Sequence, residues 1–150
     1  MISPTVGKCL SCNLDNQNLR AACLRVFCHV SFSILSISPS PLRSGLIWVS
    51  TDDGNVQLTD DDGATWTNVG ENIPDVPTGI WVPHIEPSHH DESVAYVVLE
   101  DHRRGDWTPY IYKTEDFGET WKDISDSNIQ SFVHVIREDP IEPNLLLILH

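Results

Sequence analysis

An eight-residue pattern occurs twice in the chain, and this repeat constrains the fold more than any other feature of the sequence. Both copies fit the template Thr-x-Asp-x-Gly-x-Thr-Trp, with Thr59, Asp61, Gly63, Thr65 and Trp66 in the first and Thr114, Asp116, Gly118, Thr120 and Trp121 in the second. Five fixed residues that recur in register within 150 residues indicate a repeated structural unit.

The residue types predict that each copy is a tight hairpin turn. The aspartates can accept hydrogen bonds from backbone N–H groups about two residues on. The glycines stand where turns commonly need a positive φ. The second threonine favours the start of a new strand, and the tryptophan supplies a large apolar surface that must be buried. We therefore assign both aspartates to turn stabilisation and not to catalysis.

Short apolar runs between turn residues predict two four-stranded units and the beginning of a third. We expect strands at 30–39, 46–50, 56–59 and 65–69, then at 81–87, 94–99, 110–113 and 120–124, and finally at 132–136 and 145–149. A four-stranded unit repeated at about 40–50 residues is typical of a β-propeller blade. A flat β-sandwich would explain the number of strands but not the recurrence of the turn.

We therefore predict an all-β fold, a partial β-propeller over residues 30–150. Its blades are expected at 30–70 and 79–125, with an incomplete blade at 131–150. The nearly continuous apolar runs at 46–49 and 94–99 are typical of strands that are covered on both faces.

The second unit contains an insertion, which we expect to form an enlarged loop at 100–109. Trp48 and Tyr96 are 48 residues apart, whereas Thr59 and Thr114 are 55 apart. The loop holds the best candidates for ligand binding, because a tryptophan face with nearby charges suits a sugar ring or a peptide. These candidates are Asp101, His102, Arg103 and Trp107. A solvated polar loop is the plainer interpretation.

The first 29 residues do not share the repeat and are expected to form an irregular segment. They contain all four cysteines, Cys9, Cys12, Cys23 and Cys28. The spacing would allow a zinc site, but the second pair is wider than usual, so free thiols are the preferred interpretation, followed by disulfides. The apolar run at 26–37 begins too late for a clear signal peptide.

Charge and motifs exclude several classes of function. The formal net charge is −13, from 22 acidic and 9 basic residues, which argues against a nucleic-acid partner. No nucleophile elbow or phosphate-binding glycine loop is present, so this chain by itself is not expected to be an enzyme. We expect no cofactor and no metal site, and interpret His89-His90 as part of a surface turn.

The repeated template resembles the Asp-box, or BNR repeat, of sialidases, xyloglucan-cleaving glycosidases, photosystem assembly factors and sortilin-type sorting receptors. The resemblance covers about residues 30–148, including 51–56, 109–114 and 135–140. It implies a β-propeller whose Asp-boxes lie at the blade periphery, away from the ligand site. It also implies a secreted, periplasmic or lumenal parent protein.

The resemblance leaves two functions open. The favoured one is a non-catalytic segment of a sortilin-like or BNR-repeat protein that binds a protein, a peptide or a glycan. The alternative is part of a sialidase- or xyloglucanase-like glycoside hydrolase whose catalytic residues lie in missing blades. Since propellers usually close with about 4–8 blades, we expect a fragment whose partners are further blades or further copies of the chain.

Overall fold

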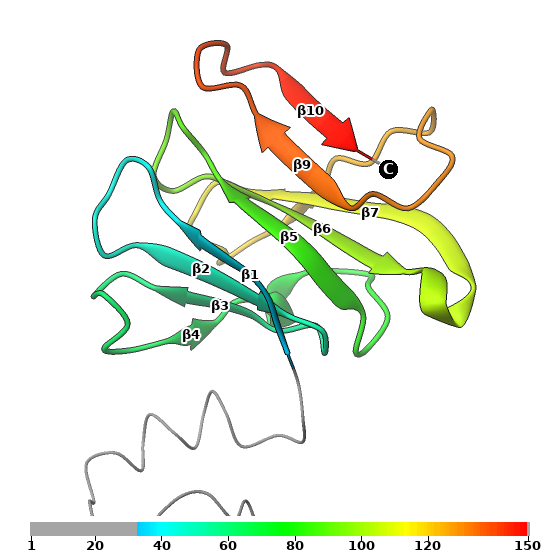
Figure 1. The fold of residues 1–150 in the computed structure, drawn as a ribbon, viewed down its shortest axis with the longest axis horizontal. Helices are drawn as coiled ribbons and strands as arrows, with labels where there is room; N and C mark the ends of the chain where they lie inside the picture. The colour runs from blue at the N-terminus through cyan, green and yellow to red at the C-terminus, as the bar shows by residue number, and fades with distance from the viewer. Residues whose placement is uncertain (1–32, 150) are drawn as a thin grey trace, which may run out of the picture. The chain divides into compact units, whose positions relative to one another are not determined.

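The computed structural model describes residues 33–149; the predicted segment at 1–29, with its four cysteines, lies outside them. The described residues form three antiparallel sheets (Figure 1). The first contains β1 (Ile34–Pro39), β2 (Ile47–Thr51), β3 (Val56–Thr59) and β4 (Thr67–Asn68). The second contains β5 (Trp81–Pro87), β6 (Ala95–Asp101), β7 (Asp106–Thr114) and β8 (Lys122–Asp123), and the third β9 (Val135–Glu138) and β10 (Leu146–Leu149).

Consecutive strands pair in every sheet, so the two four-stranded sheets are meanders and the third is a hairpin. The first strands of successive sheets lie side by side, β1 against β5 and β5 against β9 (Figure 1). Short 3-10 helices follow β4 at Gly70–Asn72 (η1) and β6 at His102–Arg104 (η2). The predicted all-β partial propeller is confirmed: the chain forms two four-stranded blades and the first two strands of a third.

The hydrophobic core lies between the sheets, and β6 contributes to it from both faces. Since successive side chains of a strand point to opposite faces, alternate residues of β6 enter different clusters. Ala95, Val97 and Leu99 pack between the first and second sheets with Trp48. Tyr96 and Val98 pack between the second and third sheets. The apolar run at 94–99 is thus buried on both faces, as predicted.

Equivalent positions in the three sheets show which faces the described residues leave open. The first hairpin of each sheet is closed by the same backbone hydrogen bond, to the carbonyl of Leu46, Val94 or Leu145. Two residues on, Trp48 and Tyr96 are buried, whereas the third sheet has Leu147, which is 55% exposed. At the other end, Ile85 is fully buried but its equivalent in β1, Ile37, is 63% exposed.

Both octapeptides form turns with two consecutive residues in the left-handed region. In the first turn motif (59–66) these are Asp62 (φ 58°) and Gly63 (φ 89°), and in the second (114–121) Phe117 (φ 57°) and Gly118 (φ 84°). This pattern is that of a type I′ turn. The positive φ of the glycines is confirmed, but the positive φ of the residue before each glycine was not predicted.

The aspartate of each turn motif bonds farther along the chain than predicted. Asp61 Oδ1 accepts from the backbone N–H of Thr65 at 2.8 Å, four residues on rather than two, and Asp61 Oδ2 accepts from the Thr65 hydroxyl at 2.7 Å. Asp116 and Thr120 repeat both bonds. Because these threonines are held within the turns, the strands expected at 65–69 and 120–124 are only two residues long, β4 and β8.

The predicted burial of the two tryptophans is confirmed for one of them. Trp121 is buried between the first and second sheets. Trp66 is half-buried, and its indole N–H donates to the carbonyl of Gly63 within its own turn at 3.1 Å.

The enlarged loop expected at 100–109 is mostly strand. β6 continues to Asp101, β7 begins at Asp106, and these two residues pair with each other. Only 102–105 connect them, as η2 followed by Gly105 with φ 85°. The inserted residues therefore lengthen a hairpin, because continued pairing satisfies backbone groups that a loop would leave to water.

Candidate binding site at the β6–β7 hairpin

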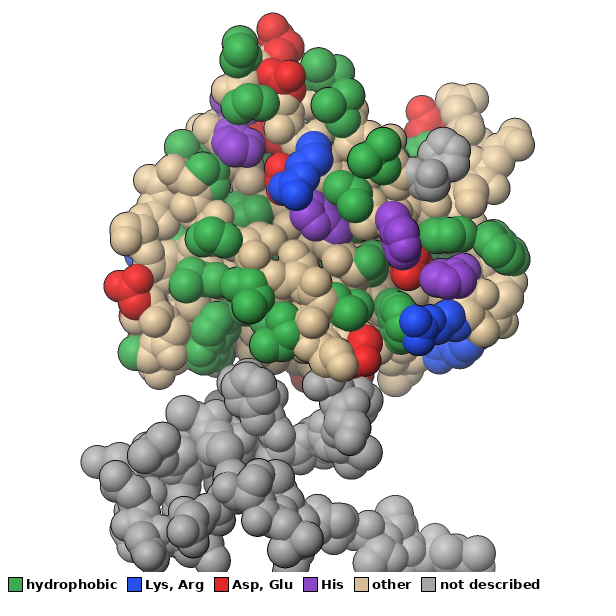
Figure 2. Space-filling view, in the orientation of Figure 1, with side chains coloured by type: hydrophobic (Ala, Val, Ile, Leu, Met, Phe, Trp, Pro, Cys, Tyr) green, Lys and Arg blue, Asp and Glu red, His purple; other side chains and the backbone are tan. Residues whose placement is uncertain are grey.

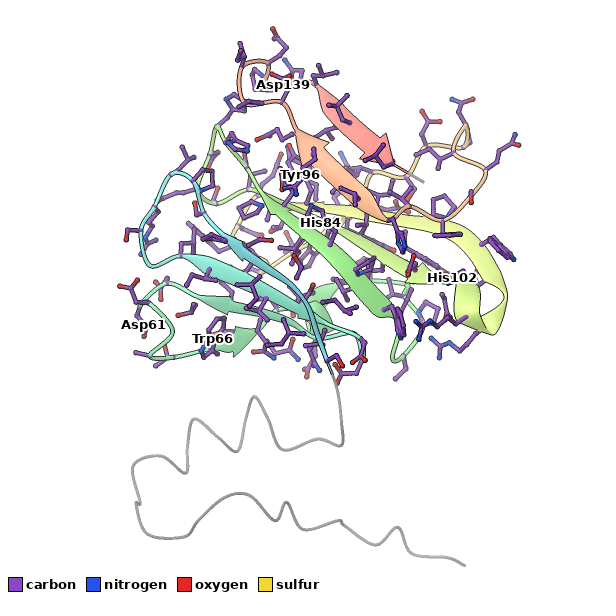
Figure 3. The ribbon with its side chains drawn as sticks, viewed as in Figure 1. Asp61, Trp66, His84, Tyr96, His102 and Asp139 are labelled. Atoms are coloured by element: carbon purple, nitrogen blue, oxygen red, sulfur yellow. The ribbon has the colours of Figure 1, made fainter. Side chains whose placement is uncertain are left out.

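Seven side chains gather around the turn of the β6–β7 hairpin, and we call them the hairpin cluster. They come from the start of β5, from the hairpin, and from the segment that precedes β9. The members are Trp81, Glu100, His102, Arg103, Trp107, Phe132 and His134. Figure 3 shows His102 at this turn, and His84 farther along the same face on β5.

Glu100 is the buried charge at the centre of the hairpin cluster. Only 2% of the residue is exposed. Its Oε1 lies 3.4 Å from His102 Nδ1 and its Oε2 lies 2.7 Å from His134 Nδ1. The His134 contact is close but lacks hydrogen-bond geometry, so Oε2 has no hydrogen-bond partner among the described residues. The two imidazoles are the polar groups nearest to this buried carboxylate among the residues of the hairpin cluster.

The aromatic members form a surface that solvent can reach. His102 stacks on Phe132, with ring centroids 4.7 Å apart and planes at 23°. Trp107 lies 5.5 Å from Phe132 and is 57% exposed. The guanidinium carbon of Arg103 lies 3.1 Å from the ring centroid of Trp81, a cation–π contact. An exposed aromatic face with flanking cations can stack on planar or ring-shaped ligand groups.

The structure brings together three of the four predicted ligand residues. His102 and Trp107 have ring centroids 6.3 Å apart, and Arg103, the next residue after His102, lies over the ring of Trp81. Asp101 has another role: it is buried and accepts a 2.6 Å hydrogen bond from Arg104 Nε. It therefore holds the hairpin turn together instead of facing a ligand.

Sequence reasoning missed four members of the hairpin cluster as site residues: Trp81, Glu100, Phe132 and His134. A weak signal was present, because Trp81-Val82 and Phe132-Val133 stand at corresponding places near the start of the second and third units. An aromatic residue recurring there brings two rings to one end of neighbouring sheets. Only the packing of β5 beside β9 shows that they surround the same turn.

A second polar group lies along β5 and β9. Glu86 is 4% exposed, and its carboxylate lies 2.6 Å from Arg137 Nη1 and 3.5 Å from His84 Nε2. Burial raises the pKa of Glu86, but His84 and Arg137 lower it by more, so the net shift is downward. Arg137 is the stronger partner, because the long His84 contact lacks hydrogen-bond geometry.

The side chains of the two adjacent histidines lie near different groups. His89 Nε2 lies 3.9 Å from Glu86 Oε1, whereas His90 Nε2 lies 2.9 Å from the carbonyl of Asp139. Among residues 33–149, no three histidine, cysteine or acidic side chains are grouped so that they could hold a metal ion.

Histidine and basic side chains are visible together on one face of the protein. Figure 2 shows His, and Lys or Arg, in a diagonal row across the face that carries β1, β5 and β9 in Figure 1. The row stands out because the whole chain has a net charge of −13.

In the part described, no helix has the length and apolar character to cross a bilayer.

No protein-family model matches the chain. Among curated proteins, the vacuolar protein sorting/targeting protein PEP1 of Saccharomyces cerevisiae strains RM11-1a and AWRI1631 is 33% identical over 122 residues, which are 78% of this chain and 7% of the yeast protein. The chain thus corresponds to a small part of these relatives.

Two solved structures show the same fold at low sequence identity. The GH74 xyloglucanase from Xanthomonas campestris has a TM-score of 0.60 and 15% identity, over 78% of this chain and 19% of that one. YCF48 bound to D1 peptide has a TM-score of 0.50 and 18% identity, over 75% and 32%. The chain is therefore a β-propeller segment that is similar in sequence to a yeast vacuolar sorting protein and in fold to GH74 and YCF48 propellers.

Proposed function

We propose that this chain is a non-catalytic propeller segment that binds an extended peptide at the hairpin cluster. The observation that carries the proposal is the exposed face of Trp107, which lies beside the rings of Phe132 and His102. A large, rigid aromatic surface beside charged groups is a common anchor for peptide side chains. The names of the sorting protein and of the peptide-bound YCF48 agree with this class of ligand.

The alternative is part of a glycoside hydrolase, and the carboxyl groups of the described residues support it less well than they support peptide binding. A glycosidase needs one carboxylic acid with a raised pKa beside a second carboxylate. Where a carboxyl pKa in residues 33–149 is clearly shifted, as in Glu86, Asp106 and Asp116, the shift is downward. At the hairpin, Asp101 accepts a hydrogen bond from Arg104, and Glu100 is buried next to His134.

The two turn motifs are, in this proposal, Asp-boxes with a structural role. Their carboxylates accept hydrogen bonds from the threonines of their own turns, and each turn joins the third and fourth strands of its sheet. Whereas the residues at the equivalent positions of the second sheet are buried, Ile37 and Leu147 are exposed. Further blades of a longer parent chain, or another copy, would cover them.

Selection of peptides from a random library on the immobilised chain tests the binding role. Peptides that bind the hairpin cluster should lose most of their affinity for Trp107→Ala, and part of it for Arg103→Ala. Leu42→Ala is the control, since Leu42 is 49% exposed and lies outside the hairpin cluster. If every selected peptide binds Trp107→Ala as tightly as the unchanged chain, the proposal is wrong.

A glycan is the second candidate, because an exposed indole also stacks on pyranose rings. Xyloglucan oligosaccharides should be tested with the same variants. Binding of the oligosaccharide that depends on Trp107, without any peptide binding, would replace the peptide by a glycan as the ligand. Release of reducing sugar by the unchanged chain would contradict the non-catalytic assignment.

A further inference from the structure

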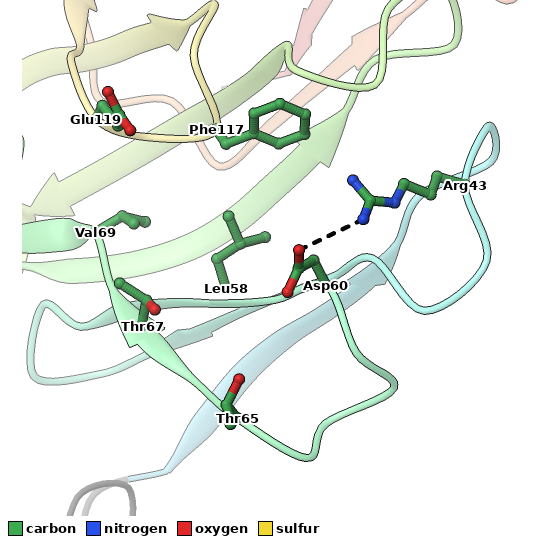
Figure 4. A pocket seen from close by; sticks show the side chains of 8 residues that line it. All are labelled: Arg43, Leu58, Asp60, Thr65, Thr67, Val69, Phe117 and Glu119. Carbon is green, nitrogen blue, oxygen red and sulfur yellow. Dashed lines mark hydrogen bonds and ion pairs between the residues drawn. The ribbon is translucent and has the colours of Figure 1, made fainter.

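A pocket of about 330 Å³ lies between the two turn motifs (Figure 4). The first motif contributes Asp60 and Thr65, and the second contributes Phe117 and Glu119. Leu58 and Val69 supply further apolar wall, and Thr67 and Arg43 complete the lining. The pocket belongs to the junction of the first and second sheets and shares no residue with the hairpin cluster.

Phe117 adopts a backbone conformation that its residue type disfavours. Its φ of 57° lies in the left-handed region, where a bulky side chain is a genuine outlier. The equivalent residue of the first turn motif is Asp62 (φ 58°), and aspartate tolerates this region better. Because both turns share this conformation, the turn geometry imposes it, and its result is that the Phe117 ring forms part of the pocket wall.

The charges around the pocket leave it with an excess of carboxylate. Arg43 Nη2 lies 3.4 Å from Asp60 Oδ2, and both side chains are well exposed, at 38% and 63%. Glu119 is exposed and forms no ion pair within residues 33–149. The lining therefore contains two acidic groups and one basic group.

We propose that this inter-turn pocket binds an arginine side chain of a partner protein. The aliphatic stem of arginine would lie on Leu58 and Val69, and its guanidinium would reach Glu119 and the face of Phe117. A planar cation that is only weakly hydrated suits an aromatic wall next to a carboxylate. Charge complementarity favours this occupant over a purely apolar side chain, which would leave Glu119 without a partner.

Blocked amino acids test the pocket directly, with N-acetyl-arginine amide as the probe. Titration into the full chain, followed by amide chemical shifts, should move the signals of Thr65, Phe117 and Glu119 in a saturable way. N-acetyl-citrulline amide has almost the same shape but no charge, and should bind about tenfold more weakly because it loses one charge-assisted contact.

Two variants distinguish the contribution of the Glu119 charge to affinity from that of the Phe117 ring. Glu119→Gln should reduce the affinity for the arginine probe by about tenfold, while Phe117→Asn, which suits a positive φ, should reduce it without unfolding the chain. Glu92→Gln, at an exposed position outside the pocket lining, is the matched control and should bind as the unchanged chain does.

Equal affinity for the citrulline probe would overturn the proposal, and so would full affinity in Glu119→Gln. Saturable shifts confined to the hairpin cluster, or no saturable shift, would also overturn it. If the amide signals of the inter-turn pocket do not shift, the proposal that a peptide binds at Trp107 is unaffected, because different amides monitor the two sites.

Discussion

The indole nitrogen of Trp121 donates a 3.1 Å hydrogen bond to the backbone carbonyl of Val69, 52 residues earlier in the chain. The ring also meets Trp48 edge to face, with centroids 6.2 Å apart and planes at 74°. Trp66 occupies the same place in the first turn motif but bonds to Gly63 of its own turn. The same motif thus joins two sheets in one copy and stabilises only its own turn in the other.

Removing Trp121 should therefore cost more stability than removing Trp66. Trp121→Ala deletes a buried ring between two sheets, and we expect the free energy of unfolding to fall by about 3–5 kcal/mol. Trp66→Ala removes a half-buried ring and should cost less than half as much. Urea unfolding of both variants measures the difference, and equal losses would contradict the assigned contacts.

The glycines of the two turn motifs should also differ. Both have a positive φ, so alanine is strained at either position, by about 1–2 kcal/mol. At Gly118 an added Cβ would also come within 2.8 Å of Val69 Cβ, whereas at Gly63 the nearest atom is Trp66 Cζ2 at 3.5 Å. We expect Gly118→Ala to destabilise the fold by a further ~1–3 kcal/mol. Thermal unfolding of the two variants compares them, and a greater loss in Gly63→Ala would refute the packing argument.

Acid should weaken both turn motifs. Hydrogen bonds from the backbone and hydroxyl of Thr65 lower the pKa of Asp61 to about 2, and Thr120 lowers the pKa of Asp116 in the same manner. Since the unfolded value is about 3.9, the stabilisation is complete above that pH and is lost as the pH falls toward 2.

Urea unfolding between about pH 5 and pH 2 follows this loss. The double variant Asp61→Asn, Asp116→Asn should show a shallower dependence of stability on pH. Thr65→Val keeps the carboxyl group of Asp61 but removes one hydrogen-bond donor. The pH dependence of its stability should therefore lie between those of the unchanged chain and the double variant. An unchanged slope in the double variant would exclude these aspartates as its source.

Glu138 joins the third sheet to the second through buried hydrogen bonds. It accepts from the Ser88 hydroxyl at 2.7 Å, the His89 backbone N–H at 2.6 Å and the Tyr96 hydroxyl at 2.9 Å. Burial and the bond to Glu138 raise the pKa of Tyr96. Glu138→Ala leaves buried donors without an acceptor, and we expect a loss of about 2–4 kcal/mol. Glu138→Gln keeps the side-chain volume and one carbonyl acceptor and should cost less, which chemical denaturation can measure. An equal loss in the two variants would show that the retained acceptor does not stabilise the fold.

Local chemistry made much of the fold predictable. Apolar runs separated by turn residues predicted all ten described strands, although β4 and β8 are shorter than expected. Those two are short because Thr65 and Thr120 bond to aspartates instead of pairing across strands. The insertion was detected by spacing, but its hairpin form depends on pairing between Asp101 and Asp106, which spacing does not reveal.

The candidate site was less predictable, because its members are distant in the sequence. Asp101, His102, Arg103 and Trp107 were expected together from their proximity along the chain, and Asp101 proved to bond with Arg104. Phe132 and His134 complete the hairpin cluster from the next sheet, 30 and 32 residues after His102.

The sequence by itself determined the repeating four-stranded unit and its two turn motifs, because the Thr, Asp, Gly and Trp of each motif act within eight residues. Only the tertiary structure decided which side chains meet between sheets: Trp121 with Trp48, Glu138 with Tyr96, and His102 with Phe132. Those contacts follow from how one sheet packs on the next, and packing is a property of surfaces that no single stretch of sequence contains.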